Sequence, residues 1–168
     1  LKIQANNVLI GEPDDPLADH TLRLAADTFN RGFSAYNIIG LTTLQVADDA
    51  VVDVSMPAYR FSDFAANQPG GAEPQAALEL WTPTLFQENP AKGVLTQRGG
   101  ASLSLQAGGS QINQIDPLKS VLTIGQGARI SVDPGQRINL RSAGQLTVDG
   151  ELNAWGGTLD IRQQQFSS

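Results

Sequence analysis

Through the second half of the chain, apolar residues recur in pairs two positions apart, with a polar residue between the two members. The pairs are Leu103/Leu105, Leu122/Ile124, Ile130/Val132, Ile138/Leu140, Leu146/Val148, Leu152/Ala154 and Leu159/Ile161. Such alternation is typical of a β-strand that buries one face. The pattern therefore predicts a series of short strands from Ala101 to Ile161.

The spacing of these pairs indicates how the strands are connected. From Leu122 to Leu159 the first members of successive pairs lie 6 to 8 residues apart, so each strand is followed by a tight turn and no helix fits between two strands. The segments between pairs carry residues that favour turns, at Gly127, Asp133-Pro134-Gly135, Gly144, Asp149-Gly150 and Gly156-Gly157.

Strands this short suit either an antiparallel meander of hairpins or a parallel solenoid with three strands in each coil. Three successive steps add up to about 22 residues, which lies in the range of periods found in stacked repeats. We therefore predict an all-β fold, a right-handed parallel β-helix (β-solenoid).

The N-terminal segment, residues 1–54, shows the same pattern and is predicted to form further coils. Its pairs are Leu22/Leu24, Tyr36/Ile38, Leu44/Val46 and Val52/Val54. The segment ADTFNRGF lies between the first two pairs, and Leu22, Ala25, Ala26 and Phe29 would share one helical face. We therefore expect at most a short helix ending near Gly32.

Residues 55–93 interrupt the pattern and read as a Pro/Gly-rich insertion or linker between the N-terminal coils and the C-terminal coils of residues 94–168. Five of the nine prolines fall in this segment. Its AALELWTPTLF stretch fits one strand or one helical turn. We expect the insertion to pack on the solenoid, with Trp81, Leu85 and Phe86 as a cover.

Composition excludes several classes of function. The chain has 11 Lys and Arg against 17 Asp and Glu, a net charge of −6, without a basic cluster, which argues against nucleic acid as a partner. It has no cysteine and one histidine, so the usual zinc ligand sets are out of reach. No apolar run is long enough for membrane insertion. We expect no enzyme activity, no catalytic residue, no cofactor and no metal.

Polar side chains between the apolar pairs are the remaining candidates for a site. Arg137, Arg141 and Trp155 are candidate glycan contacts, because arginines and aromatic rings on a strand face can bind saccharides. Alternation alone requires polar residues at the outward positions, and we favour a solvated face. Asp14, Asp15, Asp19 and His20 lie close together, but their spacing matches no calcium motif, and a polar loop is the preferred interpretation.

The run GARISVDPGQRINLRSAGQLTVDGELNAWGGTLDI resembles the repeat of filamentous-haemagglutinin-type exoproteins. GGASLSLQAGG is similar to a shorter repeat of that family, and RLAADTFNRGFSAYNIIG resembles a domain of some members. The family consists of β-helical proteins of Gram-negative bacteria that are exported by two-partner secretion. The chain lacks the Asn-Pro-Asn motifs of the family's secretion domain, which indicates an internal shaft or capping region.

The resemblance implies a structural segment of a large adhesin that is secreted or held at the cell surface of the Gram-negative outer membrane. Its partners would be neighbouring β-helix coils of the parent chain, the outer-membrane secretion transporter, and a host or bacterial surface receptor of unknown identity. A carbohydrate-binding or carbohydrate-active β-helix domain is the alternative.

Overall fold

The protein is described by a computed structural model that covers residues 1–12, 19–67, 77–109 and 116–163. The all-β prediction is confirmed. In this part of the chain most residues lie in strands, and the helices are three short 3₁₀ helices of three to five residues. The strands are β1 (Lys2–Ile10), β2 (Thr21–Leu24), β3 (Ala35–Val46), β4 (Val51–Val54), β5 (Ala58–Phe61), β6 (Leu78–Trp81), β7 (Phe86–Asn89), β8 (Val94–Gln97), β9 (Ser102–Ala107), β10 (Val121–Ile124), β11 (Arg129–Val132), β12 (Arg137–Ser142), β13 (Gln145–Val148), β14 (Glu151–Asn153) and β15 (Thr158–Gln163). The helices are η1 (Ala26–Asn30), η2 (Ala65–Asn67) and η3 (Pro117–Lys119).

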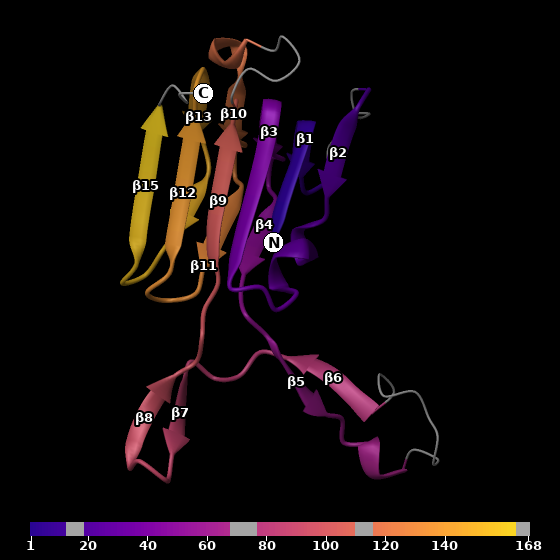
Figure 1. The fold of residues 1–168 in the computed structure, drawn as a ribbon, viewed down its shortest axis with the longest axis vertical. Coiled ribbons are helices and arrows are strands. Elements are labelled where there is room, and N and C mark those ends of the chain that lie inside the picture. The colour runs from indigo at the N-terminus through magenta and orange to yellow at the C-terminus, as the bar shows by residue number, and fades with distance from the viewer. Residues whose placement is uncertain (13–18, 68–76, 110–115, 164–168) are drawn as a thin grey trace.

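Strands β1–β4 and β9–β15 form what we call the parallel stack, in which every described strand pair is parallel. An eight-stranded sheet has the order β13-β10-β3-β9-β12-β15, in which β1 also pairs with β3 and β2 pairs with β1. A three-stranded sheet has the order β14-β11-β4. The long strand β3 joins two parts of the larger sheet, because its first half pairs with β9 and its second half with β10. Figure 1 shows β15, β12, β9, β3, β1 and β2 side by side, with β4 and β11 behind them.

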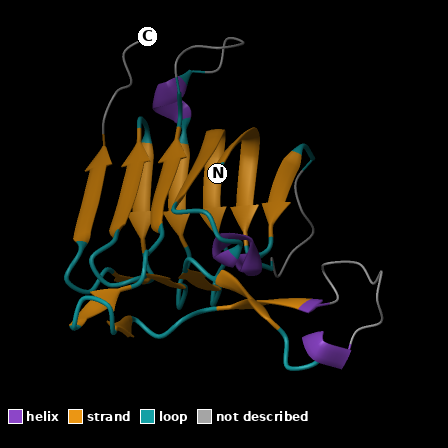
Figure 2. Cartoon of the chain, turned by 60° about the horizontal axis from the view of Figure 1, so that its bottom comes forward, coloured by secondary structure: helices purple, strands orange, loops and turns teal. Residues whose placement is uncertain are grey.

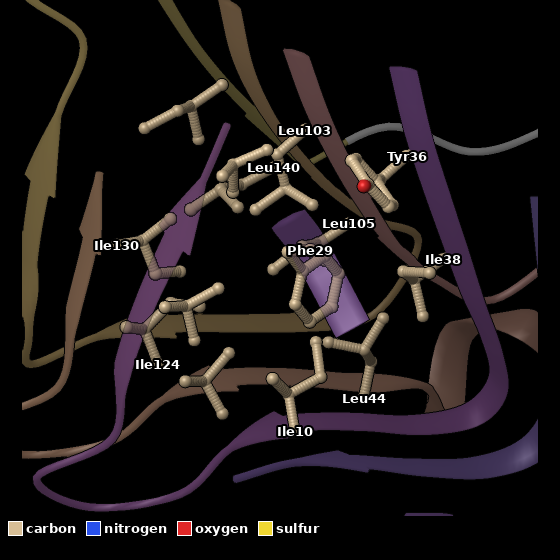
Figure 3. Packing of buried hydrophobic residues seen from close by; sticks show 14 of the residues in the cluster. Ile10, Phe29, Tyr36, Ile38, Leu44, Leu103, Leu105, Ile124, Ile130 and Leu140 are labelled. Carbon is tan, nitrogen blue, oxygen red and sulfur yellow. The ribbon is translucent and has the colours of Figure 1, made fainter. Parts of the chain in front are cut away.

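The register stacks the apolar pairs of the sequence directly on one another. Leu103 is paired with Ile138, and Ile138 with Leu159. Similar rows run through Leu44, Leu122 and Leu146, and through Val52, Ile130 and Leu152. Members in the middle of each row are at most 1% exposed and meet in one core, drawn in Figure 3. Each fully buried aliphatic side chain contributes about 1.5–3 kcal/mol to folding.

The N-terminal end of the stack contains a strand that the pair pattern missed. In β1 the register shifts between Ala5 and Asn7, so the inward residues Ile3 and Ala5 are out of phase with Val8 and Ile10. A β-bulge of this kind breaks a period-2 pattern, which explains why sequence spacing did not reveal the strand.

The short helix expected before Gly32 is the 3₁₀ helix η1, which ends at Asn30. Its Phe29 is fully buried and packs on Tyr36, with ring centroids 5.5 Å apart. The backbone N–H of Ser55, just after β4, donates to the carbonyl of Phe29 at 3.1 Å. Helix η1 therefore lies against β4, at the place where a further strand of the three-stranded sheet would lie.

The insertion does not form the expected cover. Residues 58–97, which we call the hairpin arm, contain two antiparallel hairpins, β5-β6 and β7-β8, and the second hairpin passes the expected boundary at residue 93. The hairpins project from one end of the strands and diverge from each other (Figure 1; Figure 2). Of the residues expected to cover the stack, Trp81 packs instead under Arg60 of its own hairpin, with 5.0 Å from Arg60 Cζ to the ring centroid, and Phe86 is 56% exposed.

A buried ion pair joins the arm to the stack. Arg98 donates two hydrogen bonds to the carboxylate of Asp133, at 2.8 and 2.5 Å, and the backbone N–H of Met56 donates to the same carboxylate at 3.3 Å. Met56 precedes the arm and Arg98 follows it, so one turn residue between β11 and β12 holds both ends. We call this arrangement the Asp133 clasp.

Turns of successive layers also bond to each other. The turn at Asp48-Asp49 lies against Gly125-Gln126-Gly127. The Gln126 N–H donates to Asp48 Oδ1 and the Asp49 N–H donates to the Gln126 carbonyl, both at 2.9 Å. Gly127 has φ +70°, and a Cβ on it would lie 2.1 Å from Asp49 Oδ1. The positive φ therefore favours glycine here, and any larger residue would have to displace the Asp49 carboxylate.

Candidate functional site

A polar surface of the stack lies on the outward side of β3, β9, β12 and β15. Pairing places Asn37, Ser104, Asn139 and Asp160 in one row across these strands. A neighbouring row contains Ser102, Arg137 and Thr158. A shallow depression crosses both rows and is lined by Ala35, Tyr36, Asn37, Ser102, Leu103, Ser104, Gly135, Arg137, Asn139 and Thr158.

Two of the three predicted glycan contacts, Arg137 and Trp155, lie near the turn that precedes β12, and of the two only Arg137 lines the depression. Arg137 begins β12 and is exposed, and its backbone N–H donates to Ser102 Oγ at 3.2 Å. Trp155 belongs to the next layer, where its carbonyl accepts from the Gly135 N–H at 2.8 Å, and its side chain is 72% exposed. Arg137 and Trp155 therefore flank one turn, while the exposed indole leaves an aromatic face available to solvent.

The third predicted contact, Arg141, lies toward the opposite end of β12. Its Nη2 is 3.8 Å from Asp160 Oδ2, and Asp160 also accepts from Arg162 Nε at 2.6 Å. Arg141 Nε is buried without a hydrogen-bond partner among the described residues. Arg141 is thus engaged within the strand row, and the structure does not bring it together with Trp155.

The surface is suited to hydrogen bonding. Its amide, hydroxyl and guanidinium groups offer donors and acceptors of the kind that bind polyols. On the other sheet, the Asn153 side chain donates to Glu151 at 2.7 Å, and this bond together with the charge of Arg129 lowers the pKa of Glu151. A carboxyl group with a lowered pKa stays ionised near neutral pH and is a poor general acid.

Searches against protein-family models, curated proteins and solved structures found no match. The resemblance to filamentous-haemagglutinin-type repeats thus rests on the sequence motifs alone.

The remaining expectations concern metal binding and membrane insertion. Asp14 and Asp15 of the considered calcium cluster lie outside the described residues, while Asp19 and His20 lie in a turn before β2. Within the described ranges, no group of three or more His, Cys, Asp or Glu side chains is arranged to hold a metal ion. No helix in that part of the chain is long and apolar enough to cross a membrane.

Sequence spacing missed some contributors to the polar surface. Asn37, Ser102 and Ser104 come from strands that are far from β12 in sequence, and only the register places them beside Arg137. The alternation did mark these positions as outward. The alternation does not give the register between neighbouring strands, because the register depends on the length of each connecting segment.

Proposed function

We propose that the parallel stack is a segment of a right-handed parallel β-helix with a structural role in a large secreted or surface-exposed adhesin of the filamentous-haemagglutinin type. The observation that carries the proposal is the set of in-register aliphatic rows. Strands β9, β10 and β11 pair in turn with β12, β13 and β14, and β12 then pairs with β15. This order is what a chain gives when each coil of three strands lies on the preceding coil.

The proposed role follows from how such a stack is stabilised. Each coil contacts only its neighbours, so stability grows by nearest-neighbour contacts and a long shaft needs no distant interaction. The buried rows are mostly aliphatic, with Tyr36 and Ser142 as exceptions, and most outward positions are polar. Adhesion to surfaces or cells would then depend on what the shaft displays, including the hairpin arm.

Surface labelling tests this proposal. Antibodies raised against the purified chain should label intact cells of the source organism, and the label should disappear when the gene for its two-partner secretion transporter is deleted. An antibody to a cytoplasmic protein, used on the same cells, controls for lysis. Antigen found only after the cells are broken open would overturn the proposal.

A second candidate, carbohydrate binding, is favoured by the polar depression and by the exposed Trp155, whose carbonyl bonds to the turn that precedes Arg137. A glycan array probed with the purified chain should then give saturable binding that Arg137→Ala and Trp155→Ala each weaken at least about tenfold. Arg129→Ala is the matched control, because this exposed arginine lies on the other sheet. Binding that survives both substitutions would reject the polar depression as the site.

A further inference from the structure

The two ends of the parallel stack differ. At the N-terminal end, η1 lies against β4, and Phe29 fills the interior beneath it. At the C-terminal end, each of β13, β14 and β15 has one described neighbour, namely β10, β11 and β12. Among the described residues, no helix or aromatic ring packs over the interior at this end.

The apolar rows continue to this C-terminal edge without being covered. Leu159 and Ile161 are 47% and 44% exposed, although their row partners Ile138 and Leu140 are fully buried. Leu146, Val148, Leu152 and Ala154 are only partly buried and pack on the core from one side. The inward positions of the last layer are therefore aliphatic and incompletely covered, except for Gln163 at the end of β15, which is paired with the buried Ser142.

An unpaired strand edge with such a row is a template for another strand. We propose that β13, β14 and β15 form a docking edge for one further coil of parallel strands, whose inward residues are aliphatic and two positions apart. The proposal rests on the proposed β-helical function and identifies the end at which a neighbouring coil binds. The coil would place its aliphatic residues over Leu146, Leu152 and Leu159.

The geometry favours a further parallel coil over a second copy of the chain. Two copies meeting through this edge about a two-fold axis would pair their strands antiparallel, unlike every described pair of the stack. A copy added head to tail would bring its η1 over β14, where no strand would be available to pair. A parallel coil meets neither obstacle and continues the contacts that β15 already makes with β12.

The test adds one coil to the chain. A copy of residues 143–163 is placed directly after Gln163, in place of residues 164–168, and amide hydrogen exchange is measured in both proteins. Exchange in the original β13, β14 and β15 should slow at least about tenfold, because their amides become part of an interior layer. The melting temperature should rise.

The matched control carries serine in the added coil at the copied equivalents of Leu146, Val148, Leu152, Leu159 and Ile161. This extension has the same length and turns, and it should leave the exchange of the original strands unchanged.

Three results would overturn the proposal. These are equal exchange in the aliphatic and serine extensions, loss of folding in the aliphatic extension alone, or an unextended chain that is a dimer with β13–β15 already protected. The last result would assign the edge to a second copy. Surface labelling is independent of all three, so failure here leaves the adhesin proposal standing.

Discussion

The parallel stack and the hairpin arm are both built from β-strands, yet apolar side chains are buried in the stack and exposed in the arm. In the stack, Leu105 and Ile138 are fully buried between neighbouring layers. In the arm, Tyr59 and Phe61 of β5 are 74% and 75% exposed. The comparison shows that alternation alone does not decide burial. A strand with a neighbour on each side gains an interior, whereas a two-stranded hairpin does not.

The two faces of the arm hairpin β5-β6 differ, because one is wholly apolar and the other combines an ion pair with Trp81. Pairing places Tyr59 opposite Leu80 and Phe61 opposite Leu78 on one face. On the other face, Arg60 Nε binds Glu79 Oε1 at 2.5 Å. The arm is thus held by local contacts and by the Asp133 clasp, while the stack is held by a shared core.

The largest expected effect is that of a charge within the stack. Ile138→Asp should unfold the protein, because it buries a carboxylate between Leu103 and Leu159 and costs about 4 kcal/mol or more. Thermal unfolding followed by circular dichroism gives the measurement. An unchanged melting temperature would contradict the shared core of the stack.

The next largest effect is expected at the clasp. Asp133→Ala leaves the Arg98 guanidinium without its buried partner, and breaking such a pair costs about 3–5 kcal/mol. The double variant Asp133→Ala/Arg98→Met should recover part of this loss, since it removes the uncompensated charge. If the single and the double variant unfold at the same denaturant concentration, the loss caused by Asp133→Ala does not come from the unpaired Arg98 charge.

A smaller loss is expected from the same chemical change at the edge of the stack. Leu146→Asp should cost about 1–3 kcal/mol, because Leu146 is only partly buried in the edge strand β13 and its carboxylate can reach water. Denaturant titration of this variant beside Ile138→Asp measures the difference. Equal losses would mean that β13 is covered as fully as β12.

The smallest effect is expected in the arm. Phe61→Ser should change the free energy of unfolding by less than about 0.5 kcal/mol, since the ring is mostly exposed. Phe29→Ser, which removes a fully buried ring of the core, is the matched control and should lower the free energy of unfolding several times more. A large loss from Phe61→Ser would show that the arm packs on another part of the chain.

The sequence predicted the apolar pairs of the stack well, because a strand with one buried face repeats every two residues. It also marked Arg137 and Trp155 as outward or turn positions. It missed β1, because the bulge between Ala5 and Asn7 shifts the phase of the pattern. Local periodicity carries no information about such a shift.

Contacts between distant segments could not be predicted. Asp133 reads as an ordinary turn residue, and only the fold brings it to Arg98 and Met56. The expected cover was wrong for a related reason: the exposed aromatic residues of the arm look like core residues in sequence. The two strands of each hairpin pair with each other, and these rings stay exposed to solvent.

The Asp133 clasp also has a use in protein engineering. Because Met56 and Arg98 contact the same carboxylate, the chain leaves the stack and returns to it at nearly one point. Segments whose two ends lie close together can be exchanged for other folded units with little strain on the host. Residues 58–97 thus mark a grafting position, at which a foreign domain with neighbouring termini could be displayed on a rigid support.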